Sequence, residues 1–352
     1  MILNELLNKI VPLDTESMRN AQIRLDSLTK PLGSLGKLED IVVKLSGINC
    51  SSAPKVDNKA IVVMCADNGV VEEGVSSCPK SVTASVTCNF TRGITALNVF
   101  SRLTQSKVVV VDIGVDADIQ NDAIVSRKIR KGTWNMVKGA AMTEEEAIKG
   151  IMTGIEIVKD LKEEGVNLLG TGEMGIGNTS TSSAITAVFT GEPVERLVGV
   201  GSGLSKAAYI NKIEVIKRAI EINKPDANNP IDVLAKVGGF DIAGLTGCFL
   251  GAAIYRIPIV IDGFISAAAA LTAIRINPKA REYMFTSHGS AEPGAEIVMK
   301  AINMEPMLNL NMRVGEGTGA ALGFQIIDAA MAAYTQMGTF ADAQIEQYVP
   351  QE

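Results

Sequence analysis

Aromatic side chains, histidine and paired cysteines are scarce in this sequence. Phe, Tyr and Trp make up 4% of the 352 residues, and His288 is the only histidine. A dedicated zinc site needs a cluster of thiolate or imidazole ligands. The cysteines show no C-x-x-C spacing that could supply one, so we expect no metal ion; they are Cys50, Cys65, Cys78, Cys88 and Cys248.

Excess positive charge and long apolar runs are also missing. The net charge is −6, and the basic residues are scattered except for a short run at 127–131, which we interpret as a solvated edge. No nucleic-acid partner is therefore expected. We find neither a signal peptide nor an uncharged apolar run of about 18 residues, the length that a membrane span needs. The sequence predicts a reduced, cytoplasmic protein that works without a membrane.

Short apolar, β-branched segments alternate with helical patterns along most of the chain. This alternation is typical of βαβ units, and near-continuous apolar strands are typical of a sheet that helices cover on both faces. We predict an α/β fold with a doubly wound, mostly parallel sheet. The expected strands are Ala60–Cys65, Val108–Ile113, Val166–Leu169, Ile257–Ile261 and Tyr283–Thr286. The expected helices are Val82–Arg102, Glu144–Glu163, Thr179–Phe189, Lys206–Ile222, Asp241–Tyr255, Ser266–Arg275, Ala291–Ala301 and Gly319–Gln336.

The two ends of the chain differ from this pattern. The first ~50 residues predict helices around a Pro- and Gly-containing turn at Lys30–Gly36. The residues after Met337 return to polar, helix-like sequence. We predict a sheet domain at residues 56–315 that carries the site. Residues 1–55 and 316–352 are expected to form a smaller helical lobe beside it.

Polar, glycine-rich segments follow the predicted strands. Ligands of open parallel sheets bind outside the carboxyl ends of the strands, so we expect the site there. In Gly170–Ser180, glycines allow main-chain N–H groups to approach an anion, and the following helix pattern favours negative charge at its start. We interpret this segment as a phosphate site, with a plain strand-to-helix turn as the alternative. Further candidates for holding the phosphate, or for lining the same edge, are Gly201, Gly203, Lys212 and Gly263.

The same segment also matches G-x-G-x-x-G, at Gly170, Gly172 and Gly175. A dinucleotide-binding oxidoreductase is therefore an alternative. However, Glu173 would place a carboxylate inside the pyrophosphate cradle, and no acidic residue ends a clear second strand about twenty residues later. Glu173 suits ribose hydroxyls better, so the oxidoreductase stays a remote alternative.

A second motif surrounds Glu316. In Arg313–Ala321 this carboxylate stands between glycines before an Ala-rich helix, where a substrate can approach it closely, as a general base requires. From spacing alone, an acidic residue that simply favours the helix N-terminus is an equally good interpretation. His288 is another candidate base, but a hydrogen-bonding role fits it better because carboxylates dominate the same edge.

Together these motifs resemble the nicotinate-nucleotide:dimethylbenzimidazole phosphoribosyltransferases, from about Leu25 to Ala333. Each segment alone is short, and it is their combination that is specific. The matching segments are Leu25–Gly36, Glu73–Ser76, Gly172–Thr179, Gly238–Ala243, Asp262–Ile265, Ser290–Gly294 and Gly315–Leu322.

The resemblance implies an activity and a set of site residues. Glu316 would be the general base, taking the proton of an aromatic acceptor that attacks C1′ of the ribose, while nicotinate leaves and the configuration inverts from β to α. Nicotinate mononucleotide is then a substrate, and we expect no separate cofactor. The donor is expected to contact Glu173, Gly175, Gly177, Asn178, Thr179, Ser180, Lys212 and Ser290. The acceptor is expected to contact Pro79, Ser85, Met174, Val314 and Glu316.

Four positions depart from the usual pattern of that family. Asn68 and Ala295 stand where histidine is usual, Cys78 where tyrosine is usual, and Ser85 where glutamine is usual. We expect these positions to cluster around the acceptor. They lead to the hypothesis of an altered acceptor, including phenols such as p-cresol that would give an O-linked ribotide.

Assembly is left open by the resemblance. The family implies a homodimer with sites completed near the subunit interface. In one branch of the family, the members work as pairs of paralogous subunits. The alternatives are therefore a heterodimer and a subunit that is inactive alone.

Overall fold

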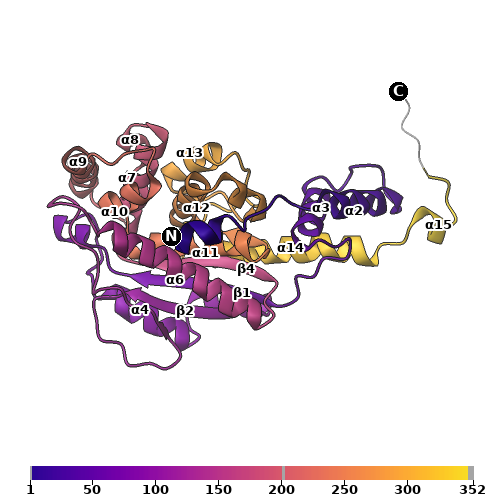
Figure 1. The fold of residues 1–352 in the computed structure, drawn as a ribbon, viewed down its shortest axis with the longest axis horizontal. Helices are drawn as coiled ribbons and strands as arrows, with labels where there is room; N and C mark the ends of the chain where they lie inside the picture. The colour runs from indigo at the N-terminus through magenta and orange to yellow at the C-terminus, as the bar shows by residue number, and fades with distance from the viewer. Residues whose placement is uncertain (1, 200–202, 348–352) are drawn as a thin grey trace.

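A six-stranded parallel sheet organises the molecule (Figure 1). The computed structural model describes residues 2–199 and 203–347. The strand order is β3-β2-β1-β4-β5-β6, and every neighbouring pair runs parallel. The predicted α/β fold is therefore confirmed, with the order reversing between β1 and β4. The strands are β1 Lys59–Ala66, β2 Lys107–Gly114, β3 Val125–Ser126, β4 Leu168–Met174, β5 Ile259–Ile261 and β6 Met284–Thr286.

Helices account for most of the remaining structure. No helix within residues 2–199 and 203–347 combines the length and the apolar character that crossing a membrane demands. The helices are α1 Ile2–Leu7, α2 Thr15–Ser27, α3 Lys37–Asn49, α4 Val82–Thr91, α5 Ala96–Leu103, α6 Glu144–Glu163, α7 Asn178–Thr190, α8 Val194–Leu197, α9 Lys206–Asn223, α10 Pro230–Val237, α11 Phe240–Ile254, α12 Phe264–Ile276, α13 Pro293–Ala301, α14 Thr318–Gln336 and α15 Phe340–Ala343, with 3₁₀ helices η1 Gly69–Glu73 and η2 Pro278–Tyr283.

Side-chain alternation in the central strands assigns helices to the two faces of the sheet. In β4, a Cβ on Gly170 would touch Ala320 of α14, whereas the hydroxyl of Thr171, one residue on, lies 2.6 Å from Ser266 of α12. Successive strand residues point to opposite faces. Helices α14 and α12 therefore cover opposite faces, and a strand buried on both sides needs the largely apolar sequence that β1 shows.

The prediction that β4 ends at Leu169 is wrong, because the strand continues to Met174. The two glycines within it leave room for the chain that crosses beside them. A Cβ on Gly172 would lie 2.7 Å from the carbonyl oxygen of Glu316. Gly170 and Gly172 therefore belong to a buried strand and cannot form the phosphate loop of a dinucleotide-binding motif.

Other boundaries also differ from the expectation. The single helix expected over Val82–Arg102 is two helices, because the chain turns at Gly93 (φ +72°) and α5 begins with a capping box at Thr95. Helix α13 begins at Pro293 instead of residue 291, since proline is well suited to the first helical turn. The two-residue strand β3 and the short helices α8 and α10 were not predicted.

Segments from both ends of the chain meet in a lobe that projects from the sheet (Figure 1). Helix α14 leaves the sheet and runs along α3, and α2 packs on α3. Arg24 of α2 lies over the ring of Tyr334, 5.2 Å from its centroid. Helix α1 instead contacts α11 in the body of the molecule. The division of the chain after residues 55 and 315 stays a prediction.

Helices α6 and α11 pack at backbone distance. A Cβ on Gly154 of α6 would lie 2.0 Å from the carbonyl oxygen of Gly244 and 2.6 Å from the amide of Cys248. Both of these atoms belong to the main chain of α11, so neither can rotate away. Glycine is required there because the two backbones touch.

We expect Gly154→Ala to lower the free energy of unfolding by about 1–3 kcal/mol or more, since overpacking strains both helices. Urea denaturation followed by circular dichroism measures the change. Gly338→Ala is the matched control, because its Cβ would meet nothing closer than 3.6 Å. Equal unfolding midpoints for the two variants would contradict the close packing of α6 on α11.

Candidate active site

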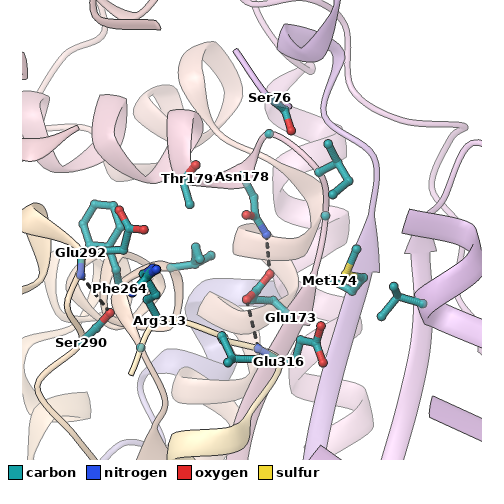
Figure 2. Close-up of a pocket in the computed structure, with 18 of the residues that line it drawn as sticks. Ser76, Glu173, Met174, Asn178, Thr179, Phe264, Ser290, Glu292, Arg313 and Glu316 are labelled. Atoms are coloured by element: carbon teal, nitrogen blue, oxygen red, sulfur yellow. Dashed lines mark hydrogen bonds between the residues drawn. The ribbon is translucent and has the colours of Figure 1, made fainter. Parts of the chain in front are cut away.

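A cavity of about 280 Å³ opens at the carboxyl ends of β4, β5 and β6 (Figure 2). This is the edge of the sheet at which the sequence predicted the site. Its walls come from α4, from the turn between β4 and α7, from α9, and from the loop before α14. Most of the predicted residues line it: Glu173, Met174, Gly175, Gly177, Asn178, Thr179, Lys212, Gly263, Ser290, Val314 and Glu316.

Four of the other predicted site residues do not line this cavity. Pro79 and Ser85 are exposed, and the hydroxyl of Ser85 donates to the carbonyl oxygen of Ser81 within the helix. Ser180 is fully buried within α7. Gly203 is exposed with open space around it, and Gly201 lies outside the described residues.

Helix α4 contributes residues that sequence reasoning missed. Val82 and Val86 are four positions apart, so one face of the helix presents both to the cavity, while Ser85 lies off that face. Val75 and Ser76 also line it. The matching segment Glu73–Ser76 was the signal that could have identified the latter two.

Glu316 stands in an unusual backbone turn. Gly315, Glu316 and Gly317 have φ values of +76°, +62° and +91°, three successive residues in the left-handed region. For a residue with a Cβ this conformation costs roughly 1–2 kcal/mol. The turn therefore needs external support, and it displays the Glu316 side chain at its apex.

Two buried carboxylates support this turn. The amide of Glu316 donates to Oε1 of Glu173 (3.3 Å), and the amide of Gly317 donates to Oδ2 of Asp262 (3.0 Å). Within the turn, the hydroxyl of Thr318 donates to the carbonyl oxygen of Gly315 (2.7 Å). Strands β4 and β5 therefore fix two consecutive amides of the turn.

The carboxylate of Glu316 itself is poised to accept a proton. It has no hydrogen-bond donor among residues 2–199 and 203–347, and it lines the cavity. Burial, aided by the nearby charge of Asp262, raises the pKa of Glu316 to about 7. A general base works best when its pKa lies near the operating pH. Glu316 therefore has the position and the proton affinity of a general base.

Glu173 forms the floor of the same end of the cavity. Burial raises the pKa of its carboxyl to about 8. The side-chain amide of Asn178 donates to Glu173 and also to Oδ2 of Asp241 (3.0 Å). Burial raises the pKa of Asp241 to about 6. The side-chain amide of Asn178, shared between the two acids, therefore holds the Glu173 carboxylate where it accepts the main-chain amide of Glu316.

His288 is buried beside this turn. Its Nδ1 lies 3.1 Å from the hydroxyl of Ser287, and a Cβ on Gly319 would lie 2.0 Å from the same ring nitrogen. The ring is therefore wedged against the start of α14 with one edge lining the cavity. This position agrees with a hydrogen-bonding residue at the edge of the sheet.

The opposite end of the cavity carries positive charge. Lys212 of α9 is almost fully buried, and its Nζ donates to the hydroxyl of Thr179 (2.8 Å). Burial lowers the pKa of Lys212 to about 8, opposed by the negative charge of Glu292. No side chain caps the N-terminus of α7, which begins after Gly177 (φ +92°). A lysine and an uncapped helix N-terminus together favour an anion.

The charged groups of this cavity are unevenly divided. Glu173 and Glu316 line it beside the turn before α14, to which the buried Asp262 is hydrogen-bonded. Lys212 lines it next to Thr179 at the start of α7, where the carboxylate of Glu292 partly offsets its positive charge. A ligand that carries an anionic group at one end and a cationic group at the other fits this division.

Comparison with known proteins agrees with this geometry. A family model described as phosphoribosyltransferase matches residues 10–345. A nicotinate-nucleotide–dimethylbenzimidazole phosphoribosyltransferase from Ruminiclostridium cellulolyticum is 64% identical over 352 residues, which is 100% of both chains. One of the same name from Clostridium acetobutylicum is 62% identical over 99% of each chain. The crystal structure of CobT from Thermus thermophilus superposes with a TM-score of 0.90 at 36% identity, covering 95% of this chain and 100% of that one.

This chain belongs to the nicotinate-nucleotide–dimethylbenzimidazole phosphoribosyltransferase family. The four positions at which the chain departs from the family pattern do not line this cavity. Asn68 is buried next to Gly175 and Gly239, and Ala295 is buried in α13. Neither Cys78 nor Ser85 lines the cavity described above. The cavity therefore gives no support to the hypothesis of an altered acceptor.

The affinity of this phosphoribosyltransferase for ribose 5-phosphate is expected to fall as the pH rises from about 7 to about 9. Lys212 loses its positive charge as the pH passes its pKa of about 8, whereas the phosphate is already ionised above pH ~6. Isothermal titration calorimetry measures the dissociation constant.

Lys212→Met should bind weakly throughout and show a smaller pH dependence. Lys217→Met is the matched control, because Lys217 is a half-exposed lysine of the same helix that pairs with Glu195 and Glu214. Binding by the wild-type protein that is independent of pH would exclude Lys212 from the anion site.

Proposed function

We propose that this protein transfers the 5-phosphoribosyl group of nicotinate mononucleotide to dimethylbenzimidazole, releasing nicotinate and forming an α-riboside phosphate. The observation that carries the proposal is the charge division of the cavity, with an unpaired, half-buried Glu316 at the end opposite Lys212. The names of the relatives that are 62% and 64% identical support the choice of both substrates.

The donor fits the cavity in one orientation. Its phosphate binds at the anion site of Lys212, Thr179 and the start of α7, with the hydroxyl of Ser290 as a further donor. Its ribose then lies over Glu173, whose carboxyl can pair with a hydroxyl. The pyridinium and C1′ reach the carboxylate end, where negative charge favours a cation.

The donor already carries an activated leaving group, its pyridinium. The protein therefore mainly has to supply a base for the reaction at C1′. One ring nitrogen of the acceptor attacks C1′, and the C1′–N bond to nicotinate breaks with its electron pair neutralising the pyridinium. The proton on the other ring nitrogen of the acceptor passes to the Glu316 carboxylate. Glycosyl transfer builds positive charge on the sugar ring, which the carboxylates at this end stabilise.

The acceptor side is apolar. Val75, Val82, Val86 and Met174 line the cavity, and Val314 precedes the Glu316 turn. A flat, largely apolar ring is the kind of ligand that buries such surface favourably. The Glu316 carboxylate is the polar group that would orient its N–H. We propose that the reaction uses no separate cofactor, since the donor already carries its leaving group.

Assembly and location remain part of the proposal. We propose a homodimer, because Leu310 and Val314 leave exposed apolar side chains in the segment that borders the cavity. A cytoplasmic location is supported by the five cysteines, which are all free, including the exposed Cys50.

Glu316→Gln is expected to lower kcat for nicotinate release by ~10²–10⁴-fold, the usual contribution of a general base. The KM for nicotinate mononucleotide should change less than kcat, because the phosphate contacts at Lys212 and Thr179 stay in place. Chromatography of released nicotinate measures the rate. Glu296→Gln is the control, since Glu296 is an exposed helix residue paired with Lys300. A variant as active as the wild type would remove Glu316 from the mechanism.

The pure chain is expected to convert dimethylbenzimidazole in preference to p-cresol and adenine. Mass spectrometry of the products from equimolar mixtures measures the preference. A preference for p-cresol would revive the altered-acceptor hypothesis. Turnover that appears only after a homologous chain is added would instead show a subunit that is inactive alone.

A further inference from the structure

Asp262 is a buried acid that contacts neither substrate in the mechanism above. It follows β5 directly and is 1% exposed. Its carboxylate accepts three main-chain N–H groups, from Gly317 (3.0 Å), Gly319 (2.7 Å) and Ala320 (3.2 Å). All three belong to the end of the Glu316 turn and the first residues of α14. An ionised carboxylate has enough acceptor sites for all of them.

The position of Asp262 is itself fixed by hydrogen bonds. Its amide donates to the hydroxyl of Ser266 in α12 (3.2 Å), and its carbonyl oxygen accepts from the hydroxyl of Ser287 (2.9 Å). Asp262 therefore connects two strand ends to the turn. The N-cap of α14 is Gly317, which has no side chain to perform this task.

Charge also links Asp262 to Glu316. Asp262 follows β5 and accepts the amide of Gly317, the residue after Glu316. Glu173 from β4, His288 from the segment after β6, Lys212 and Glu292 line the cavity together with Glu316. Arg313 precedes it in the same loop. Among these groups, Asp262 is the charged neighbour that raises the pKa of Glu316 beyond the effect of burial.

We propose that Asp262 is a positioning residue for catalysis, whose carboxylate holds the left-handed Gly315–Gly317 turn in place and whose negative charge strengthens Glu316 as a base. This inference rests on the proposed function and deepens it. Burial raises the pKa of Asp262, but the charge of His288 and the three amides oppose that rise and favour the ionised form. A mere helix cap would stabilise α14 without affecting the proton affinity of Glu316.

The test compares Asp262→Asn with Asp112→Asn in the full-length protein. Asp112 is the matched control: it is 4% exposed, and its Oδ1 accepts the amide of Val115 (2.9 Å), but it lies in β2 outside the cavity. The glutamate carboxyls are labelled with ¹³C, and Glu316 is assigned as the signal missing from Glu316→Gln. Its titration is followed by NMR, and kcat and KM for nicotinate mononucleotide are measured across pH.

In the wild type, Glu316 should titrate near pH 7 and kcat should rise as the pH passes that value, because the base works in its deprotonated form. In Asp262→Asn, loss of the negative charge should move both transitions to lower pH. The kcat at high pH should fall by about 10²-fold, the cost of misplacing a catalytic group by about an ångström. The KM for nicotinate mononucleotide should change little. Asp112→Asn should leave both transitions where the wild type has them.

An unchanged Glu316 titration in folded Asp262→Asn would overturn the inference, as would an equal loss of kcat in Asp112→Asn. If Asp262→Asn does not fold, Asp262→Ala is purified and assayed with formate, whose carboxylate can occupy the space that the side chain leaves. Formate should restore kcat, while chloride at the same concentration should not. Equal rates with both salts would also overturn the inference.

The NMR titration separates this inference from the proposed function. A wild-type protein that releases no nicotinate would defeat the proposed function alone. The shift of the Glu316 transition in Asp262→Asn would still decide whether Asp262 acts on Glu316.

Discussion

The site depends on two buried carboxylates that accept consecutive main-chain amides. Glu173 receives the amide of Glu316, and Asp262 receives the amide of Gly317. Between them, these bonds hold three successive residues in a left-handed conformation that costs free energy at Glu316. Without this support, a relaxed turn would carry the Glu316 side chain elsewhere. The sheet therefore offsets the strain by anchoring the turn at two strand ends.

Burial shapes the chemistry at both ends of the cavity. At the carboxylate end it raises the pKa of Glu173 to about 8 and that of Glu316 to about 7. At the anion end it lowers the pKa of Lys212 to about 8. Each shift follows from the same cost of keeping a charge away from water. In a site built in this way, the side chains gain and lose protons near neutral pH, which suits acid–base chemistry.

Close contacts with other protein atoms explain why two positions of the site are glycine better than ligand binding alone does. Gly172 makes room for the carbonyl of Glu316, and Gly319 makes room for the ring of His288. Both were predicted as parts of ligand-binding motifs. Their closest neighbours are instead protein atoms. Glycine is needed at these positions because the strand, the turn and the helix pack closely together around the cavity.

The sequence by itself determined the fold class, the edge of the sheet that carries the site, and about half of the residues that line the cavity. It could do so because apolar strands, helix patterns and the polar segments after the strands are local features that the chain order preserves. Glu316 stood out because it is a lone acid between glycines, although spacing left its role as a base or as a helix-terminal acid open. The family motifs added the substrates.

Tertiary structure alone decided how far β4 runs and which face of α4 meets the substrate. Only it placed Val82 and Val86 at the cavity and Ser85 away from it, because the direction of each side chain depends on how the helix is rotated against the sheet. It also revealed Asp262 as the partner of the Glu316 turn. The two acids are 54 positions apart in the chain, and hydrogen bonds between such distant segments exist only once neighbouring strands bring them together.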